Sequence, residues 1–249
     1  MRINDITEEL EEKELLALMV FPELVGGLSH EVAQPLNAIS LACEVIRFRV
    51  ERLPALNETD LNFFRDKLAG IKTQVLMAAD KISGIRRYGS KAVNSSAGDI
   101  EASFLRVSNL LRQQFISRGI EFIVQNHNEG PVPTLIDDVV LDLTIAECIV
   151  FARTRVEFLD SRHKEHNVPY EKRIEALLNR SPGPNSMVIK WNRGALQMED
   201  LVEFIPPRVK IGLSASKKII GRFGGTIQID EDGISLFFQQ TDSNPQSLG

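Results

Sequence analysis

Cysteine is rare in this sequence of 249 residues, and the two cysteines, Cys43 and Cys148, are far apart. The sequence therefore offers no basis for a disulfide framework or a zinc site, and we expect a reducing, cytoplasmic setting. A basic excess is also missing, because 29 Lys and Arg are outnumbered by 34 Asp and Glu. Nucleic acids are held mainly by clustered basic residues, so we expect no nucleic-acid partner. No apolar run approaches the ~20 residues of a membrane span, and we expect none.

Two long segments near the N-terminus have apolar residues at helical spacing. The first covers about residues 5–53, and the second begins near Thr59, after Pro54 and Asn57. Apolar residues of the second step by three and four, at Leu61, Phe64, Leu68, Ile71, Val75, Ala78, Ile82 and Ile85. This heptad seam and the short connection predict an antiparallel helical hairpin. Because a hairpin cannot enclose a core alone, we predict a homodimer with a four-helix bundle.

The remainder of the chain predicts a mixed domain. Helices are predicted over residues 102–118, 139–159 and 213–223, and strands over residues 120–124, 187–191, 226–229 and 234–238. A helical layer on a sheet is an α/β sandwich, so the whole chain is predicted to be α+β. The predicted domains are an N-terminal helical extension (1–22), the hairpin (23–90), a linker (91–98), the α/β domain (99–240) and a tail (241–249).

One histidine stands out by its neighbours, because residues 28–39 read Leu-Ser-His-Glu-Val-Ala-Gln-Pro-Leu-Asn-Ala-Ile. At ~100° per residue, His30 lies about 200° from the apolar residues Leu28 and Val32, so we expect it to be exposed. A partly neutral imidazole is a suitable nucleophile for phosphoryl transfer. Glu31 can orient the ring and accept a proton, and Gln34, one turn on, can orient a water or the phosphoryl group.

This segment resembles the phosphoacceptor motif of sensor histidine kinases, which reads His-Glu-x-x-(Thr, Asn or Gln)-Pro-Leu. The resemblance implies that His30 is the phosphorylated residue, that Glu31 is its acid–base partner, and that Gln34 acts in phosphatase or transfer chemistry. It also implies a response regulator receiver domain as the partner. The domain from residue 99 onward is similar to the ATP-binding domain of the same family in the order of its elements and in its length.

The positions that hold magnesium in that family are not kept here. The resemblance implies two asparagines on the long helix, and this sequence has Glu147 and Phe151 in their place. A phenylalanine side chain cannot coordinate a hard cation, which takes oxygen ligands. We therefore predict that the ATP site is degraded.

The glycine motifs of the ATP site survive in part. The family's Asp-x-Gly-x-Gly motif reads Asn-Arg-Gly-Ala-Leu over residues 192–196, and its Gly-x-Gly-Leu motif reads Lys-Ile-Gly-Leu over residues 210–213. Asn192, Gly194 and Gly212 are thus the predicted remnants of a nucleotide site. An asparagine can still accept one hydrogen bond through its carbonyl group.

The sequence is compatible with three functions. The first is a phosphotransfer protein that exchanges a phosphoryl group between His30 and a response regulator, with no cofactor. The second is an active histidine kinase that phosphorylates His30 from ATP with magnesium. The third is a non-catalytic scaffold that binds a regulator or a partner histidine kinase. Elsewhere, His163 and His166 lie in a charged stretch, and we expect them on a solvated face with no metal bound.

Overall fold

The structure is a computed structural model, and it describes residues 3–52, 57–89, 97–127, 130–179, 185–195 and 206–239. Side chains of residues 3–11, 26–31, 80–81, 83–89 and 97 lie outside this description. The elements in chain order are α1 (Ile3–Val50), α2 (Glu58–Gly89), β1 (Ala97–Asp99), α3 (Ile100–Ser117), β2 (Glu121–Asn126), β3 (Pro133–Asp137), α4 (Asp138–Glu165), β4 (Arg173–Asn179), β5 (Asn185–Trp191), α5 (Pro207–Arg222), β6 (Thr226–Ile229) and β7 (Gly233–Phe238). The predicted mixture of helices and sheet is confirmed.

The chain divides into two compact units. Residues 1–24 and 92–249 form the first, the α/β unit, and residues 25–91 form the second, the hairpin unit. Helix α1 contributes its first turns to the α/β unit and its remaining turns to the hairpin unit. The segment predicted as a separate extension, residues 1–22, is thus grouped with the α/β unit.

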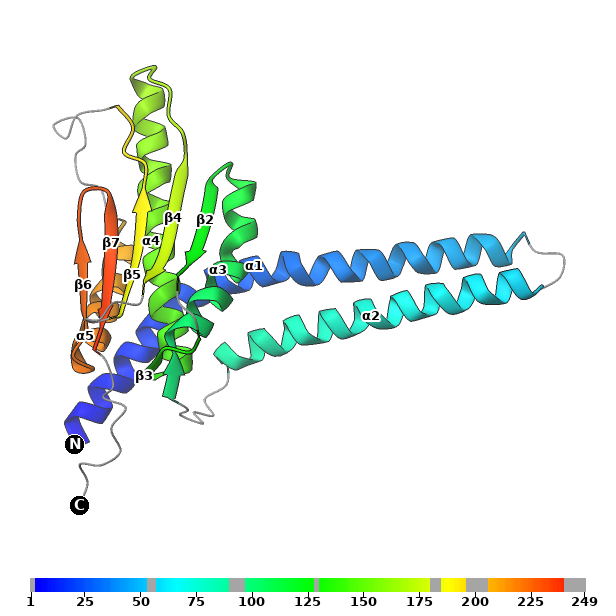
Figure 1. The fold of residues 1–249 in the computed structure, drawn as a ribbon, viewed down its shortest axis with the longest axis horizontal. Helices are drawn as coiled ribbons and strands as arrows, with labels where there is room; N and C mark the ends of the chain where they lie inside the picture. The colour runs from blue at the N-terminus through cyan, green and yellow to red at the C-terminus, as the bar shows by residue number, and fades with distance from the viewer. Residues whose placement is uncertain are drawn as a thin grey trace. The chain divides into compact units, whose positions relative to one another are not determined.

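In the hairpin unit, the later part of α1 and α2 run side by side in opposite directions (Figure 1). Asn57 caps α2, because its Oδ1 accepts a hydrogen bond from the Asp60 backbone N–H at 2.9 Å. Arg49, in the last turn of α1, donates from Nε and Nη2 to Asp60 Oδ1 at 3.0 and 2.6 Å. Its guanidinium also lies 4.4 Å from the ring centroid of Phe63. These contacts join the two helices beside the turn.

The main sheet of the α/β unit has the strand order β2-β4-β5-β7-β6. Strands β2 and β4 are parallel, and the other neighbours are antiparallel. Every second residue of the central strands is buried, and the register places Ile174 opposite Trp191 and Ala176 opposite Ile189. Because side chains alternate between the faces of a strand, these buried residues share one face. Helices α3, α4 and α5 pack on the sheet (Figure 1).

A second, short sheet pairs β1 with β3 in antiparallel fashion. It begins inside the segment predicted as a linker, residues 91–98, of which the last two belong to β1. A Cβ atom at Gly98 would lie 2.6 Å from the Ile136 carbonyl oxygen. Only glycine allows the two strands to approach this closely.

Helix α4 forms the centre of the α/β core. Every residue from Val140 to Arg153 is buried, as expected for a helix with other elements on all its sides. The helix continues to Glu165, beyond the predicted end at Leu159. None of the helices in the described ranges has the length and apolar character needed to cross a membrane.

Candidate functional site

The predicted phosphoacceptor segment lies within α1, which is one uninterrupted helix from Ile3 to Val50. The backbone of His30 and Glu31 is helical, and their side chains lie outside the described residues. The Gln34 side chain is described, and it is exposed. Because successive residues turn by about 100°, positions 30, 34, 41 and 48 fall within about 40° of one another on α1. The structure therefore places Gln34 on the same helical face as position 30.

This face of α1 continues as a row of exposed apolar side chains. Leu41 is 67% exposed, Val45 38% and Phe48 53%. Their spacing of four and three keeps them on one side of the helix. We call Leu41, Val45 and Phe48 the apolar stripe, and exposed apolar surface of this kind is typical of a protein-binding site.

The heptad seam of α2 is also exposed within a single chain. Leu61 is 44% exposed, Leu68 59%, Val75 50% and Ile82 46%, whereas Ala78 is buried. Apolar residues at heptad spacing are normally covered by another helix. The hairpin unit thus carries an apolar surface that the described residues of one chain leave half open.

The first two nucleotide-site remnants, Asn192 and Gly194, lie in the loop after β5. Both polar atoms of the Asn192 side chain have protein partners, because Nδ2 donates to the Glu171 carbonyl oxygen at 3.0 Å and Oδ1 accepts from the Gly194 N–H at 3.0 Å. The Tyr170 hydroxyl donates to the Asn192 carbonyl oxygen at 2.7 Å. These contacts hold the loop after β5 in place through Asn192.

Gly194 is packed against a histidine that we expected in solvent. Its φ is +70°, and a Cβ atom there would lie 2.1 Å from His163 Nε2. His163 is completely buried, its Nδ1 lies 2.8 Å from the Leu159 carbonyl oxygen, and its ring stacks on Tyr170 at 4.4 Å. The expectation of a solvated face was wrong for His163, because the loop after α4 covers it, and right for His166, which is exposed.

The third remnant, Gly212, lies on α5 beside a buried carboxyl group. A Cβ atom at Gly212 would lie 2.5 Å from the carboxyl carbon of Glu147, which is 2% exposed. Phe151, one turn further along α4, is 1% exposed and packs edge-on against Trp191 with ring centroids 5.8 Å apart. Both positions that the resemblance aligns with magnesium-holding asparagines are therefore interior positions.

The structure does not gather the three remnants around one point. Gly194 contacts His163, whereas Gly212 contacts Glu147. Glu147 and His163 are more than four turns apart on α4, which corresponds to about 24 Å along the helix axis. Asn192 and Gly194 therefore lie near the C-terminal end of α4, whereas Gly212 lies beside its middle turns.

A polar cluster that the sequence did not predict joins α1 to the helical layer of α3, α4 and α5. Glu23 Oε2 accepts from Arg153 Nη1 at 2.9 Å, and Glu23 Oε1 accepts from Arg208 Nη1 at 3.1 Å. Arg153 Nη1 also donates to Gln114 Oε1 at 2.7 Å, and Gln114 Nε2 donates to the Glu23 carbonyl oxygen. These four residues come from α1, α3, α4 and α5, so only the tertiary structure brings them together.

The pKa of Glu23 in this cluster and the pKa of the neighbouring Glu147 are shifted in opposite directions. Burial raises the pKa of Glu147 to about 7, and the nearby Glu23 charge adds to the effect, while Arg208 and Arg153 oppose it. Burial also acts on Glu23, but hydrogen bonds and charges from Arg153 and Arg208 hold its pKa below the ordinary value. Glu23 is thus an anion at neutral pH, and Glu147 is close to half protonated.

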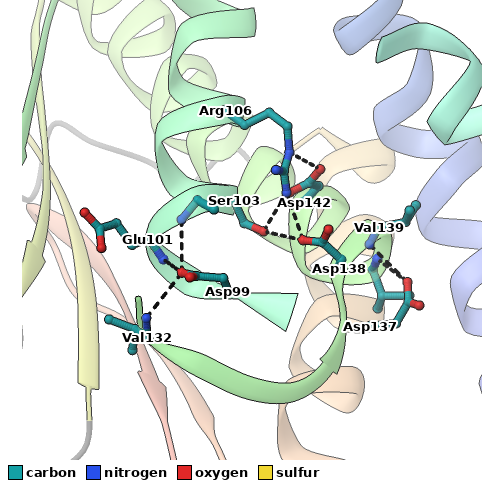
Figure 2. Close-up of polar contacts among 11 residues, drawn as sticks. Asp99, Glu101, Ser103, Arg106, Val132, Asp137, Asp138, Val139 and Asp142 are labelled. Atoms are coloured by element: carbon teal, nitrogen blue, oxygen red, sulfur yellow. Dashed lines mark hydrogen bonds and ion pairs between the residues drawn. The ribbon is translucent and has the colours of Figure 1, made fainter. Parts of the chain in front are cut away.

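A second polar network connects α3 to the first turns of α4 (Figure 2). Arg106 makes a fork to the completely buried Asp142, with Nε to Oδ2 at 2.8 Å and Nη2 to Oδ1 at 2.7 Å. Its Nη2 also lies 2.9 Å from Asp138 Oδ1 and 3.0 Å from Ser103 Oγ. The paired and hydrogen-bonded charges make this a structural clamp between the two helices.

Comparisons with known proteins find similar solved structures. No protein-family model matches the sequence, and no curated protein matches it. The catalytic domain of the histidine kinase ThkA is 15% identical, with a TM-score of 0.39 over 57% of this chain and 93% of that chain. The histidine kinase AdeS of Acinetobacter baumannii is 13% identical, with a TM-score of 0.38 over 86% and 98%. A bacterial phosphotransferase is 14% identical, with a TM-score of 0.34 over 88% and 95%.

Proposed function

We propose that the protein carries a phosphoryl group on His30 and exchanges it with the aspartate of a response regulator receiver domain. The observation that carries this proposal is the run His-Glu-Val-Ala-Gln-Pro-Leu at residues 30–36, on a long helix of a two-helix hairpin. Glu31 stands beside the nucleophile, and Gln34 follows one turn later on the same face. The protein acts in this role as a homodimer.

The exchange is a substitution at phosphorus. A ring nitrogen of neutral His30 attacks the aspartyl phosphate of the regulator, the N–P bond forms, and the bond from phosphorus to the aspartate oxygen breaks. The aspartate leaves as a carboxylate, and the proton on the second ring nitrogen passes to Glu31. Transfer from His30 to the regulator uses the same bonds in the opposite order, and Gln34 orients the phosphoryl group in both directions.

The exposed seam of α2 supports the homodimer. Leu61, Leu68, Val75 and Ile82 recur at heptad spacing and are each about half exposed in the single chain. A second hairpin that packs on this seam completes a four-helix bundle and removes these side chains from water. The second copy is therefore the occupant that we propose for the seam.

The apolar stripe supports the regulator as the partner. Leu41, Val45 and Phe48 share their helical face with position 30, and they lie between three and five turns further along α1. A receiver domain docked on this stripe places its aspartate toward His30. The stripe is separate from the α2 seam, so dimerisation and docking use different residues.

The packing of the α/β unit supports a degraded ATP site. Phe151 is packed in the core, and the Glu147 carboxyl group fills the space beside Gly212. The Asn192 amide is occupied by its own loop. These side chains are buried or hydrogen-bonded to protein groups, whereas a nucleotide and magnesium need accessible oxygen ligands and open backbone.

Transfer of labelled phosphate from a phosphorylated receiver domain to the protein tests the proposal. We expect acid-labile label on the wild type and none on His30→Gln. His166→Gln is the matched control, because His166 is exposed at the end of α4, and it should accept label like the wild type. Failure of every receiver domain of the same organism to label the wild type would contradict the proposal.

Labelled ATP with magnesium separates the kinase alternative. We expect no incorporation and no nucleotide binding in a titration. Incorporation that disappears in His30→Gln would instead show an active kinase. The scaffold alternative makes a different prediction, because it requires normal signalling by His30→Gln in cells.

A further inference from the structure

The first turns of α1 form an amphipathic segment that packs within the α/β unit. We call residues 12–24 of α1 the strap. Leu16, Val20 and Leu24 of the strap, at intervals of four residues, are completely buried, whereas Leu18 on the opposite side is 69% exposed. The burial of one face and the exposure of the other are the pattern of a helix seated on a surface.

Charged contacts seat the strap at both of its ends. Near its start, Glu12 lies 3.3 Å from Lys218 Nζ and 3.0 Å from Arg222 Nη1 of α5. Near its end, Glu23 pairs with Arg153 of α4 and Arg208 of α5 at 2.9 and 3.1 Å. The strap supplies the anions and the helical layer supplies the cations, so the two surfaces are complementary in charge.

The helical layer also donates hydrogen bonds to the backbone of the strap. Arg208 Nε donates to the Met19 carbonyl oxygen at 3.1 Å, and Gln114 donates to the Glu23 carbonyl oxygen. Both acceptors are carbonyl groups of a helix. The layer therefore recognises helical backbone in addition to acidic side chains.

Two side chains of α4 near the strap each have a buried polar atom without a hydrogen-bond partner in the described part of the chain. Arg153 Nε and Glu147 Oε1 are buried and have no hydrogen-bond partner among the described residues. Because almost all buried polar groups in proteins have hydrogen-bond partners, these two atoms leave the polar groups near the strap incompletely satisfied. The strap also ends at Leu24, where the α/β unit gives way to the hairpin unit.

We infer that the layer of α3, α4 and α5 carries a docking surface for an acidic amphipathic helix, and that the strap is its releasable occupant in cis. A partner that presents a similar helix, with glutamates eleven residues apart and apolar residues between them, competes for the same surface. This inference does not depend on phosphoryl exchange at His30, and its test does not measure that reaction.

A peptide of residues 10–26 with a fluorescent label provides the probe, used with the full-length chain. Val20→Asp introduces a charge on the buried face and should release the strap. We expect the peptide to bind Val20→Asp at micromolar concentration, and to bind the wild type at least 10-fold more weakly. Leu18→Asp is the matched control, because it adds the same charge on the exposed face, and it should behave like the wild type.

A second peptide tests the charge complementarity. Replacing both glutamates, at positions 12 and 23, by lysine should weaken binding to Val20→Asp at least 10-fold. Equal binding of the two peptides, or equal binding of the first peptide to Leu18→Asp and Val20→Asp, would overturn the inference.

Hydrogen exchange shows whether the strap alone has been released. We expect at least 10-fold faster amide exchange in residues 12–24 of Val20→Asp, with unchanged protection of β5 and β7. Should Val20→Asp lose protection throughout the α/β unit, Glu12→Lys serves instead, because a lysine there faces Lys218 and Arg222. Glu12→Lys must then speed exchange in the strap alone, and unchanged strap protection in that variant would overturn the inference.

Discussion

The α/β unit buries the apolar residues of its central helix, whereas the hairpin unit leaves many of its apolar residues exposed. In the α/β unit, α4 is buried on all sides from Val140 to Arg153, because a sheet and several helices enclose it. In the hairpin unit, seam residues such as Leu68 stay 59% exposed, because two helices present more apolar surface than they cover. One unit thus encloses its apolar core within a single chain, whereas the other leaves apolar surface that a further helix can cover.

Phe151→Ala should produce the largest effect, and it tests the completeness of the α/β unit. Phe151 is 1% exposed, so its truncation leaves a cavity and should lower the free energy of unfolding by about 3–5 kcal/mol. Urea denaturation at two protein concentrations measures this loss, which should be the same at both. Phe48→Ala, at a 53% exposed position of the hairpin unit, is the matched control and should cost less than about 1 kcal/mol. Equal losses in the two variants would remove the contrast.

Leu68→Asp should produce the next largest effect, and it acts on the proposed dimer. Each copy loses one buried leucine from the bundle, worth about 1.5 kcal/mol, so the dimer weakens by about 3 kcal/mol, or roughly 100-fold in Kd. Sedimentation equilibrium measures the change. Thr73→Asp adds the same charge at an exposed position of α2 outside the seam and should leave the Kd within about threefold. A Leu68→Asp protein that dimerises normally would show that the seam is not the interface.

The pH dependence of stability should show a smaller effect, which comes from a buried carboxyl group of the α/β unit. Burial raises the pKa of Glu147 from its ordinary value of 4.5 to about 7. Between these two pH values the folded state therefore binds more protons than the unfolded state. The contribution of Glu147 is therefore present at low pH and is lost as pH rises toward 7. From pH 5 to 7.5 the wild type should lose about 2 kcal/mol more than Glu147→Gln. Urea titrations of both proteins across this range measure the difference, and parallel curves would contradict the assignment.

Helix caps should give the smallest effects, and they allow a like-for-like comparison of the units. Asn57 accepts one backbone N–H in the hairpin unit, and Asn57→Ala should cost about 1 kcal/mol. Asp99 accepts the N–H groups of Glu101, Ala102 and Val132 in the α/β unit at 2.9, 3.1 and 3.3 Å. Asp99→Ala should therefore cost about 2 kcal/mol. Thermal unfolding followed by circular dichroism measures both losses, and the reverse ranking would contradict the difference in capping.

Periodic elements were predictable because their signal is local. The three-and-four spacing predicted both long helices of the hairpin, and the strand predicted over residues 226–229 matches β6 (Thr226–Ile229). Strand β4 (Arg173–Asn179) was missed, although its burial alternates regularly. Its charged and polar members, Arg173, Glu175 and Asn179, obscured the apolar ones. Strand β1 was missed because three residues are too few to show a period, and β3 was missed because it begins with a proline and ends with an aspartate, which are rare in strands.

The polar clusters were not predictable, because their members are far apart in the sequence. Arg106 and Asp142 are 36 residues apart, and Glu23 and Arg153 are 130 apart. A charged residue carries no local sign of its partner, and by default it belongs to a solvated surface. His163 was assigned to that surface for the same reason, until packing against Gly194 and Tyr170 buried it.

The sequence by itself determined the helices, most of the strands, and the run at residues 30–36 that motivates phosphoryl exchange, because periodicity and short motifs are properties of neighbouring residues. Only the tertiary structure decided that the strap packs with the α/β unit, that Glu147 is buried beside Gly212, and that the nucleotide-site remnants lie apart along α4. Burial and charge pairing are set by which surfaces meet when the chain folds, and residues distant in sequence supply those surfaces.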